Sequence, residues 1–255
     1  MNSLKIPAVI LAIFFSFAVQ FVHAQTFDYS NLDSVLSKYV SEDGLVDYRG
    51  VKNDNALGTY QDAVKNFDPA TLTDANEQLA FWINAYNAFT IVLIAKYYPL
   101  KSIMDIENKA GKNPWKIRFI NINGKKYHLD EIEKDIIIPE FEEPRIHYAL
   151  VCAAVSCPKL RNEAYLPSKL EEQLEEQARN FLNDEDRNYL DRKKKRMYVS
   201  KIFDWYTSDF ENADGTLINH FLKYINESDK EFIINSEVSK ISYLNYSWKL
   251  NDLKK

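Results

Sequence analysis

The reactive side chains of this chain are concentrated in residues 147–158, His-Tyr-Ala-Leu-Val-Cys-Ala-Ala-Val-Ser-Cys-Pro. The segment holds His147 and both cysteines of the sequence, Cys152 and Cys157. An imidazole can act as a general base, and a thiolate is a good nucleophile. The rest of the segment is short and apolar, which is typical of a buried strand, and we predict that strand at residues 145–154. Any chemistry is expected here first.

The two cysteines admit three states. Outside the cytoplasm the surroundings are oxidising, and two cysteines five positions apart then favour a disulfide. That bond requires the strand to end near Ala154 and the chain to turn back, and closing so short a loop adds only about 2 kcal/mol of stability. Two free buried thiols, or one reactive thiol, are the alternatives. Two cysteines and a histidine five residues before the first match no usual zinc spacing, so we predict no metal site and no cofactor.

Strand geometry decides which of these side chains share a face. Alternate residues of a strand point the same way, so His147 would face with Ala149 and Val151, and Cys152 would face the other way. A direct pair between Cys152 and His147 would then need a bulge in the strand. The alternative role of His147 is a partly buried structural histidine bonded to a carboxylate or an amide.

A long helix is predicted to begin after a cap at Thr73 or Asp74 and to end at Tyr98, with an apolar run over residues 79–98. It is apolar nearly all round, and such a helix is enclosed on all sides. Asn84 and Asn87 lie one turn apart on it. Burying an amide costs roughly 1–3 kcal/mol unless it is hydrogen-bonded. The two amides are therefore either a structural network or, as we assign them, ligand-binding groups that also orient a histidine.

A third polar group, Ser200, Lys201, Asp204 and Asp209, lies around the end of a predicted strand. A carboxylate at a strand end can orient an imidazole, as an acidic residue does in nucleophilic triads. Asp204 therefore completes a candidate catalytic set with His147 and Cys152, and we assign Lys201 and Trp205 to ligand binding. The alternative is a simple ion pair between Lys201 and Asp204.

The remaining periodicity predicts a helix-rich α+β domain with a buried central helix and a small, mainly antiparallel sheet. Helices are expected at residues 31–40, 55–67, 129–138, 168–182 and, as the last, 216–225. A hairpin over residues 115–127, strands at 188–190 and 196–203, and edge strands at 232–234 and 241–244 complete the prediction. The hairpin turns at Asn123-Gly124, and Ser168 with Glu171 is expected to cap the helix at 168–182.

The N-terminus indicates export. Lys5, an apolar run over residues 6–22 and the small residue Ala24 together resemble a secretory signal over residues 1–24, with cleavage before Gln25. The protein is then periplasmic or secreted, with no integral membrane segment once the signal is removed. The net charge of -5 argues against nucleic acid as a partner.

Three blocks of residues carry a family resemblance. Residues 79–88 (LAFWINAYNA), 145–158 (RIHYALVCAAVSCP) and 200–210 (SKIFDWYTSDF) resemble the domain-of-unknown-function family numbered 547. The similarity spans about residues 47–210, and a weaker similarity is found at residues 243–252. The resemblance implies no particular reaction.

Two family features concern individual residues. The resemblance implies that the position of Cys157 can be serine in members outside bacteria, whereas the position of Cys152 stays cysteine, which weakens an obligatory role for a disulfide. Ser247 stands where the family often has an acidic residue before the tryptophan. We expect one globular domain over residues 25–255, with residues 211–255 as an extension of the family core.

Two functions remain open at this point. The first is an exported binding domain that holds a small molecule, peptide or glycan in a polar pocket around His147, Asn84 and Asn87. The second is a thiol-dependent hydrolase or acyl-transfer enzyme, with Cys152 or Cys157 as nucleophile and His147 as base. The order of elements is loosely similar to papain-like and transglutaminase-like proteins. Those proteins carry their cysteine at the start of the central helix, whereas residues 74–78 contain none.

Overall fold

The computed structural model describes residues 26–253, which surround the central helix α4 (Ala75–Tyr97). Asp74 caps this helix, and its carboxylate accepts the backbone N–H groups of Asn76 and Glu77. α4 is long and apolar enough to cross a membrane, but it is buried inside the protein as a core helix. The signal peptide predicted at residues 1–24 lies outside the described residues.

Most of the other elements form a shell around α4. The larger apolar core joins α4 to the N-terminal helices, to a two-stranded hairpin and to a π-helix that continues into a short α-helix. These elements are α1 (Ser30–Tyr39), α2 (Tyr48–Lys52), α3 (Asn55–Asn66), α5 (Asp105–Ala110), β1 (Ile120–Ile122), β2 (Lys125–Tyr127), the π-helix η3 (Glu131–Ile137) and α6 (Ile138–Phe141). Two 3-10 turns, η1 (Pro69–Thr71) and η2 (Pro114–Lys116), connect elements of this group, and a third, η4 (Pro167–Lys169), leads into α8 (Leu170–Leu182).

A second apolar core lies beside the first, under the C-terminal helices and a three-stranded sheet. Its elements are α7 (Ile146–Ala149), α8 (Leu170–Leu182), β3 (Tyr189–Asp191), β4 (Arg196–Val199), α9 (Ile202–Trp205), α10 (Thr207–Asp214), α11 (Leu217–Tyr224), α12 (Glu227–Asn235) and β5 (Lys240–Tyr243). β3 pairs antiparallel with β4, and β5 adds to β4 in parallel. The predicted helix-rich α+β architecture with a buried long helix is confirmed, and within the described residues its strands form two small sheets where one was predicted.

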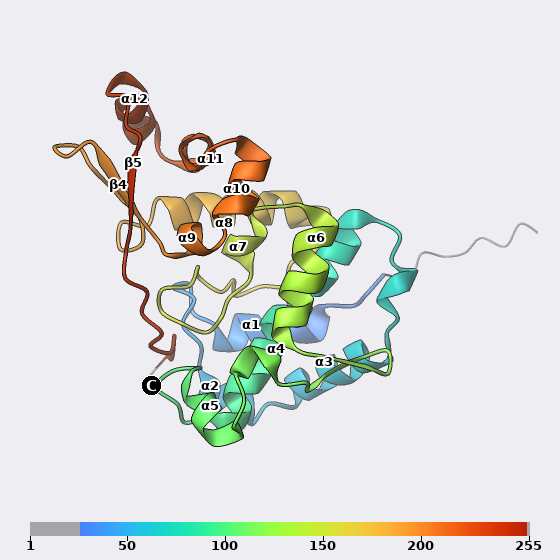
Figure 1. Cartoon of the computed structure of the whole chain (residues 1–255). Coiled ribbons are helices and arrows are strands. Elements are labelled where there is room, and N and C mark those ends of the chain that lie inside the picture. Colours follow the sequence, from blue (N-terminus) through green and yellow to red (C-terminus); the bar gives the residue numbers. More distant parts are fainter. Residues whose placement is uncertain (1–25, 254–255) are drawn as a thin grey trace, which may run out of the picture.

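After β5 the chain crosses back over the molecule to the end where α2 and α5 lie (Figure 1). Isolated bridges join Ala154 to Leu250, Ser102 to Lys249 and Val46 to Asp252 along this path. The last described residues therefore pair with residues that precede them in the sequence by as many as about two hundred residues.

The strand predicted at residues 145–154 is wrong. Residues Ile146–Ala149 form the helical turn α7, and an irregular extended segment follows it. A short apolar run does not distinguish a buried strand from a buried helical turn. The Asn87 amide bonds the backbone of Ala149 and Val151, which supplies hydrogen bonds that a sheet neighbour would otherwise make.

Three smaller predictions also fail. Residues 232–234, predicted as an edge strand, lie inside α12, so the helix at 216–225 is not the last one. The strand predicted over residues 196–203 ends at Val199, and α9 follows it. Glu171 does not complete a capping box, because its carboxylate bonds the Arg145 guanidinium.

Candidate functional site

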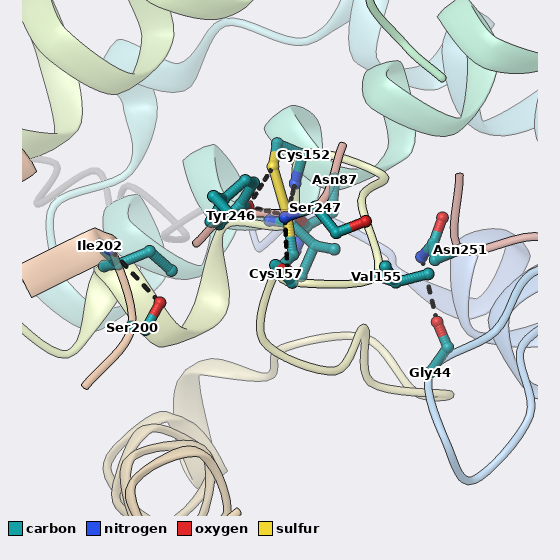
Figure 2. The surroundings of a disulfide bond; sticks show 12 residues. Gly44, Asn87, Cys152, Val155, Cys157, Ser200, Ile202, Tyr246, Ser247 and Asn251 are labelled. Atoms are coloured by element: carbon teal, nitrogen blue, oxygen red, sulfur yellow. Dashed lines mark hydrogen bonds between the residues drawn. A yellow bond between two sulfur atoms is a disulfide. The ribbon is translucent and has the colours of Figure 1, made fainter. Parts of the chain in front are cut away.

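Cys152 and Cys157 form a disulfide, with their Cα atoms 6.4 Å apart (Figure 2). Ala153 takes a left-handed conformation, with φ of 62°, as the chain turns back between them. The backbone N–H of Cys152 donates to Sγ of Cys157 at 3.1 Å. Cys157 is buried, whereas Cys152 is partly exposed. Of the three states predicted for the pair, the bonded one is observed.

Tyr246 contacts both sulfur atoms of this disulfide. Its hydroxyl lies 3.1 Å from Sγ of Cys152 and 3.0 Å from Sγ of Cys157 (Figure 2). Burial raises the pKa of Tyr246, so the hydroxyl keeps its proton and donates. The next residue, Ser247, donates its backbone N–H to the Ser156 hydroxyl at 2.9 Å. The C-terminal segment thus holds the disulfide loop in place.

Arg187 holds the same loop through its carbonyls. Its Nε donates to the Cys157 carbonyl at 3.0 Å, and its Nη2 donates to the Val155 carbonyl at 2.8 Å. An ion pair with Asp184 fixes the guanidinium. No sequence pattern indicated this role, because Arg187 lies thirty residues beyond Cys157 in a polar turn.

His147 lies on α7, and its ring is almost fully buried. Its Nε2 lies 2.8 Å from Oδ2 of Asp209, and the ring stacks on Tyr206 at 4.0 Å between centroids. The hydrogen bond from His147 holds the pKa of Asp209 below its ordinary range. The partner of His147 is therefore Asp209 on α10, in the contact predicted for Asp204.

Asp204 instead pairs with Lys201 at 2.5 Å. Both side chains are well exposed, and they stand three residues apart on the helical turn of α9. α9 replaces the end of the predicted strand here, and the His147 imidazole bonds Asp209 and not Asp204. The structure thus brings Lys201 and Asp204 together as an ion pair, which was the alternative predicted for them.

Asn84 and Asn87 direct their amides at the backbone of two loop segments. Asn84 donates to the Tyr165 carbonyl at 2.7 Å and accepts the Tyr165 N–H at 2.9 Å. Asn87 bonds the Ala149 carbonyl and the Val151 N–H, both at 2.9 Å. Neither asparagine lines the cavity described next. Asn87 positions the segment that carries His147 and Cys152, which is the structural network predicted as one alternative.

A cavity of about 380 Å³ opens beside the disulfide, and we call it the disulfide pocket. The disulfide and His147 form part of its wall. Six aromatic side chains also line it: Tyr86, Trp115, Trp205, Tyr206, Tyr246 and Trp248. Its charged lining residues are Asp130, Glu133 and Lys134. His147 also lines a second cavity, on the side of Asp209.

Three aromatic residues of the disulfide pocket pack against one another. The rings of Trp205 and Trp248 stack with centroids 5.9 Å apart, and Tyr246 lies 4.8 Å and 4.7 Å from them. Trp205 is 45% exposed, which is unusual for a side chain so large and apolar. The structure places Trp205, a predicted ligand-binding residue, in the pocket wall. Tyr246 and Trp248 were not predicted as site residues, although the weak family similarity over residues 243–252 includes both of them.

Glu133 is a buried carboxylate in the same wall, on the π-helix η3. The Tyr206 hydroxyl donates to its Oε1. Burial, and after it the charge of Glu133, raise the pKa of both Tyr206 and Tyr86. Sequence reasoning missed Glu133, because nothing in an amphipathic helical pattern marks one acidic residue as buried.

The site offers aromatic faces, one buried carboxylate and a bonded pair of sulfurs. Within residues 26–253, no group of three or more histidine, cysteine or carboxylate side chains is arranged to hold a metal ion. The arrangement suits recognition of a small molecule by stacking and by charge.

The comparisons with known proteins identify a family for part of the chain, and that family has no known function. Residues 69–182 match the family model described as "Protein of unknown function, DUF547". No curated protein and no solved structure matches the chain. The matched range holds α4, η3, α7, the disulfide and α8, and it is narrower than the resemblance read from the sequence. Residues 69–182 of this chain are therefore a DUF547 family domain.

Proposed function

We propose that this protein is an exported binding domain that holds a small ligand in the disulfide pocket. The observation that carries the proposal is a cavity of about 380 Å³ walled largely by aromatic side chains with a few convergent polar groups. Pockets for small molecules have volumes of roughly 300–1,000 Å³ and this kind of lining. A small organic molecule, or the end of a peptide or glycan, would fit such a space.

The walls of the pocket are preorganised, which favours binding. Asn87, Arg187 and Tyr246 each bond the segment that carries the disulfide. A site whose side chains are already fixed loses little conformational entropy when a ligand enters. The disulfide also occupies both sulfurs, and binding requires no free thiolate.

A screen of small sugars, dipeptides and organic amines by saturation-transfer NMR tests this proposal. At least one class should show saturation transfer that Trp205→Ala reduces by about tenfold, because this change removes an exposed aromatic wall. The matched control is Tyr189→Ala, which removes an equally exposed aromatic side chain outside the pocket. The proposal would be contradicted if no class of compound shows saturation transfer. It would also be contradicted if Tyr189→Ala reduces the signal as much as Trp205→Ala does.

A second candidate function is a thiol-dependent hydrolase or acyl-transfer enzyme. It is favoured by one observation: Cys152 and His147 line the same cavity, and Asp209 orients the imidazole. Reduction of the disulfide would have to release Cys152 first. Iodoacetamide labelling after mild reduction tests this function: rapid labelling of Cys152 well below pH 8 would favour it, and labelling only at higher pH would exclude an activated thiol.

We also propose that the chain is exported to the periplasm or the medium, after removal of residues 1–24. A disulfide persists in oxidising compartments, which fits this location. Cell fractionation and N-terminal sequencing should find the protein outside the cytoplasm, beginning at Gln25. An intact N-terminus in the cytoplasmic fraction would contradict it.

A further inference from the structure

The disulfide pocket contains a buried negative charge without a cationic partner. Glu133 is 6% exposed, and Oε1 accepts a hydrogen bond from Tyr206. Among the ion pairs of residues 26–253, none includes Glu133. A buried carboxylate loses its hydration, and a hydroxyl donor replaces only part of it. The charge of Glu133 is thus available to a ligand.

The other charges around the pocket do not neutralise Glu133. Lys134, the one cationic lysine or arginine in the described pocket lining, pairs with Asp130 at 3.1 Å. These two charges cancel at the rim, where Lys134 is exposed. The pocket therefore carries one net negative charge when His147 is neutral, and an anionic ligand would be repelled.

Aromatic rings line the same pocket as the Glu133 carboxylate. Tyr206, which bonds Glu133, lines the pocket together with Tyr86, Trp115 and Trp248. The face of an aromatic ring attracts a cation through its quadrupole, most strongly for tryptophan. Several rings beside a carboxylate form the usual arrangement for holding an alkylated ammonium group, which is weakly hydrated and prefers aromatic contacts.

We propose that the ligand of the disulfide pocket carries a small alkylated ammonium group, which lies against the aromatic walls and compensates the charge of Glu133. This inference rests on the proposed binding function and specifies the chemical class of the ligand. A neutral or acidic group in the same place would leave the carboxylate uncompensated.

Two probes of nearly the same shape test the inference on the unmodified protein. Choline carries a quaternary ammonium, and 3,3-dimethylbutan-1-ol has a neutral carbon in its place. Calorimetric titration should give an affinity at least about tenfold higher for choline. Equal affinities, tighter binding of the alcohol, or no binding of choline would overturn the inference. Binding of neutral compounds that Trp205→Ala abolishes would still leave the proposed binding function standing.

A charge variant isolates the role of the carboxylate. Glu133→Gln keeps the shape and still accepts the Tyr206 hydroxyl, so we expect choline affinity to fall at least about tenfold while affinity for the alcohol stays unchanged. The matched control is Asp135→Asn on the same π-helix, which makes the same change of charge outside the disulfide pocket. An equal loss in both variants would mean a long-range charge effect and overturn the role of Glu133. If Glu133→Gln does not fold, Trp248→Leu should reduce the preference for choline over the alcohol, and an unchanged preference would contradict the proposal.

Discussion

At the scale of single residues, Tyr246 connects the disulfide to the aromatic wall of the pocket. Its hydroxyl contacts both sulfurs, and its ring packs against Trp205 and Trp248. The sequence could not predict this contact, because Tyr246 lies about ninety residues from the cysteines and in an irregular segment. A contact between residues so far apart in the sequence belongs to no helical or strand periodicity, so no sequence pattern indicates it.

Tyr246→Phe should lower the free energy of unfolding by about 1 kcal/mol, because it removes the hydrogen bonds to sulfur and keeps the ring. Urea denaturation without reductant measures the change. Tyr243→Phe is the control, since Tyr243 is exposed and its hydroxyl makes no hydrogen bond in the structure. A loss of the same size in both variants would show that the contact with sulfur contributes nothing.

His220 is a second histidine with a carboxylate partner, and sequence reasoning did not single it out. Its Nδ1 lies 2.6 Å from Asp214 and its Nε2 lies 2.7 Å from the Tyr148 hydroxyl, in a fully buried setting. Burial lowers the pKa of His220 below its ordinary value of 6.5, although the hydrogen bond to Asp214 opposes this.

The lowered pKa of His220 predicts a pH dependence of stability. Below pH 6.5 the unfolded chain binds a proton on this histidine that the folded protein does not, so stability present above pH 6.5 is lost as the pH falls. Urea unfolding at several values between pH 6.5 and about pH 5 measures the slope. His220→Gln should flatten it, whatever its effect on absolute stability. A slope that is unchanged in this variant would assign the acid sensitivity to other groups.

At the scale of elements, α4 was predictable and α7 was not. The apolar pattern of α4, a cap at Thr73 or Asp74 and the burial of the helix were all predicted from local sequence, and the observed cap is Asp74. Local backbone hydrogen bonds hold α7, whereas the segment after it is held by Asn87, a residue on another helix. A short apolar run fits a buried strand and a buried helical turn equally well, so the local pattern could not predict α7.

Asn87→Ala should lower the free energy of unfolding by about 2–4 kcal/mol, because it leaves a buried carbonyl and a buried N–H without partners. It should also weaken ligand binding, since the segment with His147 and Cys152 loses its anchor. Denaturation and titration of the same samples measure both effects. The control is Asn66→Ala, whose amide bonds only its own helix on the surface. Similar losses in the two variants would show that Asn87 does not anchor the segment.

At the scale of the whole molecule, the disulfide pocket is assembled from distant parts of the chain. Glu133, His147 and the disulfide come from the DUF547 range, residues 69–182, whereas Trp205 and Trp248 follow it. The sequence indicated the importance of residues 147–158 and of Trp205. It did not indicate that the C-terminal segment returns to the disulfide loop, because a return of this kind depends on the whole fold.

The most direct test of the binding pocket uses the four tryptophans of the chain as reporters. Trp115, Trp205 and Trp248 line the disulfide pocket, whereas Trp82 lines a different cavity. Titration of nitrogen-15-labelled protein with choline should shift the indole N–H signals of the first three in a saturable way and leave that of Trp82 in place. Signals that do not move, or a Trp82 signal that moves as much as the others, would contradict the binding of an alkylated ammonium group in this pocket.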